Sequence, residues 1–187
     1  MYNKLIYELV AKINPIDEIE RNHQIDVLQW IDSGAELCRK QKPALPPKHL
    51  VSYVLLLDVY KNLLLLVDHK KALLWLPPGG HVDINEHPVD TAHRELKEEL
   101  GVKLPLLHTK PLFLSVTETV GLTAGHVDVS LWYVFSADSS KDYIFETDEF
   151  AKIRWFSLSD LPLEKSDPHM SRFIKKLGKH LDQNNLL

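Results

Sequence analysis

The stretch GGHVDINEHPVDTAHRELKEELGV, residues 79–102, carries the strongest signals in this chain. It predicts a helix over residues 88–100, because Pro88 suits the first position of a helix and Gly101 suits the position just past the end. Four apolar residues fall on one face of this helix and are expected to pack on a sheet: Val89, Ala92, Leu96 and Leu100.

Three carboxylates gather elsewhere on the same helix, since Glu95, Glu98 and Glu99 stand at positions i, i+3 and i+4. Like charges at this spacing cost roughly 0.2–0.5 kcal/mol per pair, and the last turn of a helix disfavours negative charge. Arg94, four residues before Glu98, offsets part of this repulsion. A hard divalent cation such as Mg²⁺ would offset more. For the helix taken alone, a solvated acidic face is the simpler interpretation.

The sequence around this helix mixes strands with helices. Residues 51–58 and 63–68 are apolar runs around a polar pair and predict a β-hairpin, although their leucines also permit a helix. The segment WLPPGG, residues 75–80, is predicted to be a loop because proline lacks a backbone donor. Downstream, the pattern predicts three strands and a closing amphipathic helix, at residues 112–120, 127–135, 152–156 and 168–181.

The first part of the chain has a helical pattern of its own. Apolar residues at three- and four-residue spacings in residues 3–40 predict two helices, parted near Pro15. Three prolines in residues 41–49 predict an extended connector. We therefore divide the chain into a helical extension, residues 1–45, and a domain, residues 46–187.

Composition excludes several classes of protein. With 22 Lys and Arg against 26 Asp and Glu, the formal charge of −4 gives no basic field for nucleic acid. The most apolar stretch, residues 51–67, is broken by Asp58 and Lys61 and is not expected to span a membrane. The single cysteine, Cys38, forms no internal disulfide and is expected to be a small half-buried hydrophobe. No signal-peptide pattern is present at the N-terminus, so we expect a cytoplasmic location.

The longer pattern is Gly80, five residues, Glu86, seven residues, and then RELKEELGV at residues 94–102. This run resembles the Nudix box of the Nudix hydrolase superfamily without a departure. The strand order over residues 50–175 also resembles the rest of a Nudix domain. The resemblance implies an α/β (α+β) fold, an α/β/α sandwich around a mixed sheet. It also implies a MutT-like protein of the stand-alone bacterial type, with a short helical N-terminal extension.

The resemblance implies roles for the box residues. Catalytic roles fall on Glu95 as metal ligand or general base, on Arg94, which orients glutamate, and on Glu98. The metal ligands that it implies are Glu95, Glu98, Glu99, the carbonyl of Gly79 and Glu149 from a loop before a late strand, with Glu146 or Asp148 as alternatives to Glu149. Gly80, Glu86 and Gly101 are expected to shape the box, with Glu86 linking loop to helix or joining the metal shell.

The resemblance further implies hydrolysis of a diphosphate linkage with Mg²⁺, for which Mn²⁺ is a possible substitute. Metal ions neutralise phosphate oxygens and lower the pKa of bound water, and a nearby carboxylate takes the proton. The chain lacks the marks of ADP-ribose, dinucleoside polyphosphate and NADH hydrolases, which favours a nucleoside triphosphate, cut to monophosphate and pyrophosphate. The alternatives are ADP-ribose, a nucleotide sugar or a non-nucleotide diphosphate. A nucleotide-sensing module with little turnover and a structural Nudix domain are alternatives of another class.

Residues outside the box have weaker signals. His81, Asp128 and Asp167 are candidate substrate-binding residues, although His81 also suits a hydrogen-bonded loop and Asp167 suits a helix N-cap. The histidines show neither an HExxH pattern nor paired cysteines, so no zinc site is expected among His81, His87, His93, His126 and His169. Core packing is expected for most of the aromatic residues Trp75, Trp132, Tyr133, Trp155 and Phe156, which could otherwise stack a base. The oligomeric state is expected to be a monomer or homodimer.

Overall fold

The computed structural model describes residues 1–41 and 45–183. Its helices are α1 (Tyr2–Ala11), α2 (Glu18–Asp32), α3 (Pro88–Leu100) and α4 (Met170–Gln183), with short 3₁₀ turns at Gly121–Thr123 and Leu163–Lys165. Its strands are β1 (Lys48–Asp58), β2 (Leu63–His69), β3 (Leu74–Leu76), β4 (Gly79–His81), β5 (Phe113–Glu118), β6 (Val127–Ser136) and β7 (Phe150–Ser157).

The seven strands form one mixed sheet, in which five strands follow the order β3-β2-β1-β6-β5 and the other two, β4 and β7, pair with β1 and β2. The long central strands β1 and β6 run parallel, and β1 forms the predicted antiparallel hairpin with β2. On the side away from β6, the strand β1 changes its partner along its length: Val51–Tyr53 pairs with β4, whereas Leu56–Asp58 pairs with β2. The strand β7 adds to β2.

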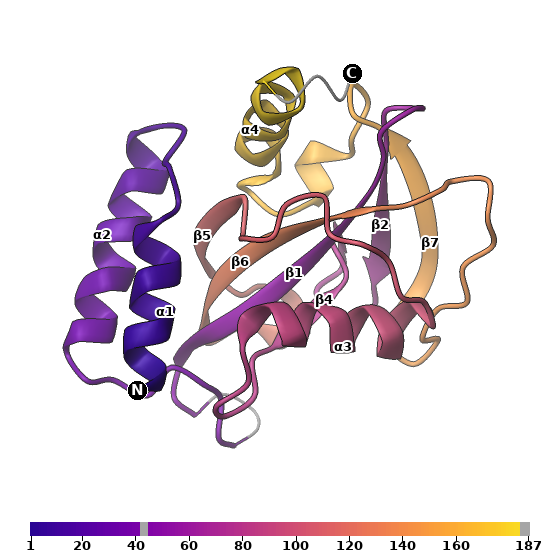
Figure 1. The fold of residues 1–187 in the computed structure, drawn as a ribbon. Coiled ribbons are helices and arrows are strands. Elements are labelled where there is room, and N and C mark those ends of the chain that lie inside the picture. Colours follow the sequence, from indigo (N-terminus) through magenta and orange to yellow (C-terminus); the bar gives the residue numbers. More distant parts are fainter. Residues whose placement is uncertain (42–44, 184–187) are drawn as a thin grey trace.

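Two hydrophobic cores cover the two faces of this sheet. Neighbouring residues of a strand point to opposite faces. Thus Val54 and Leu56 of β1 join the first core, and Leu55 and Leu57 join the second. Apolar side chains of α3 belong to the first core and those of α4 belong to the second, so the two helices cover opposite faces (Figure 1). The predicted α/β/α sandwich around a mixed sheet is confirmed.

The two predicted N-terminal helices are confirmed as α1 and α2, which lie side by side next to the β5 edge of the sheet (Figure 1). The helix α2 begins after Asp17, whose side chain accepts a hydrogen bond from the Glu20 N–H at 2.9 Å. Val10 of α1 and Ile31 of α2 are buried in the first core together with residues of the sheet. The two helices therefore share a core with the strands.

The segment WLPPGG is not a loop, and this part of the sequence prediction was wrong. Trp75 pairs with Asp68 of β2, and Gly80 pairs with Ser52 of β1, so short strands lie on both sides of the two prolines. The Pro78 carbonyl accepts a hydrogen bond from the Val54 N–H, and a carbonyl is the one backbone group that proline can still offer. The partners come from distant strands, which local composition does not reveal.

Smaller differences concern the ends of elements. The strand β7 extends beyond the predicted residues 152–156, and α4 begins at Met170 instead of residue 168. Part of the predicted connector, residues 42–44, lies outside the described residues. Within the described parts of the chain, no helix combines the length and the apolar character needed to cross a membrane.

Candidate active site

The helix α3 has the predicted bounds, and its ends show why. The His87 ring accepts a hydrogen bond from the Val89 N–H at 3.1 Å and so caps the first turn, while Pro88 occupies the first position. At the other end Gly101 adopts the left-handed conformation with φ of 66°, which glycine takes without a steric penalty. These ends fix which residues of the helix face the sheet.

Two of the three helix carboxylates are buried. Glu95 is 9% exposed and Glu99 is 6% exposed, whereas the Glu98 side chain reaches solvent. Burial raises the pKa of Glu95, and the Arg94 charge opposes this rise. Burial also raises the pKa of Glu99 well above its usual range, and the neighbouring Glu95 adds to the effect. A solvated acidic face does not describe this helix, because two of its carboxylates are removed from water.

Arg94 ties the box loop to the helix. Its Nε and one Nη atom lie 3.0 Å from the two carboxylate oxygens of Glu86, a paired arrangement that fixes both side chains. The other Nη atom donates to Glu95 at 2.6 Å and to Glu98 at 3.2 Å. Glu86 accepts a further bond from the Thr91 hydroxyl at 2.6 Å. Arg94 therefore sets the orientation of Glu95, and Glu86 joins the loop to the helix.

A Cβ atom at either of the two glycines that open the box would collide with a neighbouring group. A Cβ atom at Gly79, where φ is +145°, would lie 2.2 Å from the Ser52 carbonyl oxygen of the paired strand. At Gly80 a Cβ atom would lie 2.2 Å from the Glu95 carboxylate. The Gly79 N–H donates to Glu99 at 2.8 Å. The backbone at Gly80 and Gly79 therefore lies directly against the carboxylates of Glu95 and Glu99.

Of the three late acidic candidates, Glu149 is the one that lines a cavity together with Glu95 and Glu99. It stands in the turn before β7, and its charge helps to raise the pKa of both Glu95 and Glu99. Glu146 and Asp148 are exposed. Four carboxylates, three on α3 and Glu149, are therefore gathered at one place.

This set of donors fits a hard divalent cation. Glu95 and Glu99 are adjacent buried carboxylates whose charges repel each other, and the Glu99 carboxylate accepts a hydrogen bond from the Gly79 N–H. Carboxylate and carbonyl oxygens are the ligands that Mg²⁺ takes in proteins. Glu95, Glu98, Glu99 and Glu149 would hold such an ion, together with the carbonyl of Gly79.

A cavity of about 660 Å³ opens beside these carboxylates. The candidate substrate-binding residues His81, Asp128 and Asp167 all line it. Two basic residues that the sequence analysis did not single out, Arg39 and Lys71, also belong to its wall. They stand in no motif, and only the folding of the chain brings them to the box.

Asp167 differs in detail from its predicted role as a helix cap. Its Oδ1 accepts a hydrogen bond from the His169 N–H at 2.8 Å, in the turn that leads into α4, and the helix itself begins at Met170. Asp167 is only 3% exposed, and burial raises its pKa to about 6. The carboxyl therefore changes its protonation near neutral pH at the cavity wall.

The five aromatic residues considered for base stacking pack in or against the two cores, with Trp75 and Trp155 half-buried. Trp132 and Tyr133 are fully buried, Trp75 and Phe156 contact each other in the second core, and Trp155 packs against the first core. Core packing was the expected fate of most of them.

Comparison with known proteins places the whole arrangement in a family. A family model described as the NUDIX domain matches residues 47–177. The chain belongs to the Nudix hydrolase family. Nudix hydrolases act on diphosphate linkages in small phosphorylated substrates and depend on a divalent metal. The predicted family and enzyme class are therefore confirmed.

Similar Nudix proteins come from several organisms. The Nudix hydrolase YvcI of Bacillus subtilis (strain 168), named as uncharacterized, is 29% identical over 127 residues, which cover 62% of this chain and 77% of the relative. A MutT Nudix hydrolase from Burkholderia pseudomallei is 25% identical with a TM-score of 0.54, covering 69% of this chain and 97% of that one. A Caenorhabditis elegans Ap4A hydrolase, 18% identical with a TM-score of 0.54, shares the fold over 71% of this chain and 98% of its own.

Proposed function

We propose that this Nudix hydrolase cuts a nucleoside triphosphate to the monophosphate and pyrophosphate, with Mg²⁺ as its metal and Mn²⁺ as a possible substitute. The observation that carries the proposal is the pair of buried carboxylates, Glu95 and Glu99, beside a cavity of about 660 Å³. Cavities of roughly 300–1,000 Å³ bind small molecules of nucleotide size. The lack of marks for other substrate groups in the sequence favours a triphosphate.

The box residues divide the chemistry among them. Glu98, Glu99, Glu149 and the carbonyl of Gly79 would hold the metal, with Glu95 as a further ligand or as the base. When bound, the metal neutralises phosphate oxygens and lowers the pKa of attacking water. As the base, Glu95 would take the proton from the attacking water.

Other side chains would position Glu95 and the substrate. Arg94 holds the Glu95 carboxylate through its 2.6 Å contact, so that the carboxylate does not rotate away from the water. Arg39 and Lys71 line the cavity and offer positive charge to the phosphates. Asp167 lines the wall of the same cavity and would contact the nucleoside.

Further parts of the proposal concern the chain as a whole. We assign residues 1–45 to a helical extension and residues 46–187 to the Nudix domain. The formal charge of −4 supports a protein without a nucleic-acid partner, and the free Cys38 suits a reducing cytoplasm. The working state would be a monomer or homodimer without a membrane partner.

The test is an incubation of the purified chain with Mg²⁺ and a panel of triphosphates, ADP-ribose, nucleotide sugars, dinucleoside polyphosphates and non-nucleotide diphosphates. Mass spectrometry identifies the products. Glu98→Gln is expected to lose activity, and Glu8→Gln, which changes an exposed carboxylate of α1, is the matched control. Turnover of triphosphate to monophosphate and pyrophosphate supports the proposal. Cleavage of another compound replaces the substrate, and binding without turnover favours the sensing module.

A further inference from the structure

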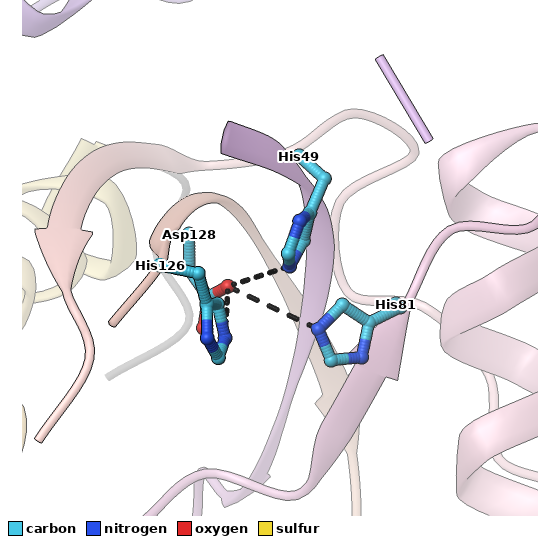
Figure 2. Close-up of side chains that lie close together, drawn as sticks. All are labelled: His49, His81, His126 and Asp128. Atoms are coloured by element: carbon cyan, nitrogen blue, oxygen red, sulfur yellow. Dashed lines mark ion pairs between the residues drawn. The ribbon is translucent and has the colours of Figure 1, made fainter. Parts of the chain in front are cut away.

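A second cluster of potential ligands adjoins the same cavity, and three of its four members, His81, His126 and Asp128, line the cavity wall. His49 of β1, His81 of β4, His126 just before β6 and Asp128 of β6 each offer one ligand atom, and these atoms all lie within 4.8 Å of one another. Figure 2 shows the three rings grouped around the Asp128 carboxylate. One oxygen of that carboxylate lies 3.3 Å from His49 Nε2, 3.3 Å from His126 Nε2 and 4.0 Å from His81 Nε2.

The centre of this cluster is buried and short of hydrogen-bond partners. His49 is fully buried, yet its Nε2 atom has no hydrogen-bond partner. The same is true of the buried atoms His81 Nε2 and Asp128 Oδ1. Buried polar atoms in proteins almost always have partners, and one group bound at the centre would supply a partner to all three atoms.

In His49 and His126, the hydrogen bond made by Nδ1 determines whether Nε2 presents a proton or a lone pair to the centre of the cluster. The His49 Nδ1 atom lies 2.8 Å from the Pro46 carbonyl oxygen, which can only accept, so Nδ1 carries the proton. His126 Nδ1 lies 3.2 Å from the Thr119 hydroxyl. That hydroxyl has one proton, which the Thr123 carbonyl receives at 2.7 Å, so Nδ1 of His126 is the donor. In the neutral rings both Nε2 atoms then present lone pairs toward a carboxylate.

Lone pairs that converge on a carboxylate repel it, and a cation removes the repulsion. Metal-binding histidines usually donate their other ring N–H to a carbonyl, carboxylate or water, and His49 has this arrangement. Three imidazole nitrogens and one carboxylate oxygen suit Zn²⁺ in a tetrahedral site, and they do not suit Mg²⁺. With zinc bonds of about 2.0–2.1 Å, tetrahedral ligand atoms lie about 3.3 Å apart. His49 and His126 already have this spacing from Asp128.

The cluster is separate from the carboxylates of α3. His49 precedes Leu50 in β1, and Asp128 precedes Val129 in β6. Leu50 and Val129 pack in the first core with α3, so His49 and Asp128 point to the opposite face of the sheet. The parallel register of β1 and β6 pairs His49 directly with Asp128.

We propose that His49, His81, His126 and Asp128 form a zinc site that joins β1, β4 and β6 beside the cavity. Four protein ligands complete a closed, structural zinc site, and such an ion would hold the wall of the cavity in place. The site commits His81 and Asp128 to zinc rather than to the substrate. Zinc binding here depends on neither the proposed substrate nor the box carboxylates.

The experiment titrates the full chain, freed of metal by a chelator, with Zn²⁺ and Co²⁺ in the presence of excess Mg²⁺. We expect one ion per chain, visible d–d bands of tetrahedral intensity with Co²⁺, and a rise of about 5 °C in the thermal midpoint with Zn²⁺. His81→Gln and His126→Gln should each lose the bands and the rise. Because these side chains are less buried than His49, the apo variants should stay folded by circular dichroism.

Two control variants test where the ion binds. His108→Gln changes a histidine outside the cluster and should keep full binding. Glu98→Gln removes a carboxylate of α3 and should also keep it, so this result is independent of whether the proposed hydrolysis is found. The proposal is overturned if the native chain binds no stoichiometric Co²⁺, if both cluster variants bind as the native chain does, or if Glu98→Gln alone loses the ion.

Discussion

Lys176 Nζ lies 2.7 Å from Glu20 Oε1, so a charged pair inside the protein joins the last helix to the N-terminal helices. Glu20 is fully buried, and its two oxygens also accept hydrogen bonds from the backbone N–H groups of Leu114 and Ile16. The helix α2 is thereby joined to both β5 and α4. This pair connects the proposed extension to the domain that contains the site.

Lys176→Met is expected to lower the free energy of unfolding by about 3–5 kcal/mol, because it leaves the Glu20 carboxylate buried without its cation. Urea unfolding followed by circular dichroism measures the change. Lys175→Met, at the exposed neighbouring position, is the control and should change stability by less than about 0.5 kcal/mol. Equal destabilisation by the two substitutions would show that the pair of Lys176 and Glu20 contributes no specific stability.

Alanine at the two box glycines should have different consequences. Gly79→Ala brings a Cβ against the backbone of Ser52, which cannot move without breaking the pairing of β4 with β1, so we expect a loss of about 2–4 kcal/mol of stability. Gly80→Ala meets only the end of the Glu95 side chain, so the fold should remain while kcat falls. Thermal unfolding and a hydrolysis assay separate the two effects.

Gly178→Ala is the control for these glycine substitutions. Nothing lies within 4 Å of a Cβ at this position in the middle of α4, so alanine should stabilise the helix by about 0.5–1 kcal/mol. Full activity of Gly80→Ala would show that hydrolysis does not depend on the present position of the Glu95 carboxylate.

Arg94→Lys tests the positioning of Glu95. Lysine keeps the charge but cannot bond both oxygens of Glu86 while it holds Glu95, so the paired contacts of the guanidinium are lost. We expect kcat to fall about 10- to 100-fold, with a smaller change in KM. Arg21→Lys, on the exposed surface of α2, is the matched control. Unchanged kcat in Arg94→Lys would mean that charge alone is sufficient.

Asp167→Asn should change how stability depends on pH. The carboxyl has a pKa of about 6 in the folded protein against a usual value of 3.8, so the folded state binds its proton more tightly than the unfolded state does. The stabilisation that this tighter proton binding gives the folded state is complete below about pH 3.8. It is lost as the pH rises through about 6, a change of about 3 kcal/mol at most. The variant should therefore gain stability relative to the native chain between pH 4.5 and 7.5.

Urea midpoints measured across this pH range check the prediction. Asp160→Asn, an exposed aspartate in the turn after β7, is the control and should follow the native chain. Parallel pH curves for the native chain and Asp167→Asn would contradict a raised pKa at Asp167.

Local patterns predicted much of the fold. The bounds of α3 follow from Pro88 and Gly101, because both residues act on the backbone at their own positions. The apolar runs of β1 and β2 were recognised because burial on both faces requires apolar residues in succession. The segment around Pro77 was predicted wrongly, because its two short strands depend on partners in β2 and β1 rather than on their own residues.

The candidate site, too, was predicted from the sequence only in part. The carboxylates of α3 were predicted together, because a helix brings residues three and four positions apart to one face. Glu149, rather than Glu146 or Asp148, lines the cavity with Glu95 and Glu99, and this depends on how the turn before β7 meets α3.

By itself, the sequence determined the family, the helix that carries the carboxylates and the mixture of strands and helices. Each of these depends on spacings within one element, where neighbouring residues set the geometry. Only the tertiary structure decided that Glu95 and Glu99 are buried and that His49 meets His81, His126 and Asp128. Those histidines lie far apart along the chain, and the pairing of β1 with β4 and β6 brings them together.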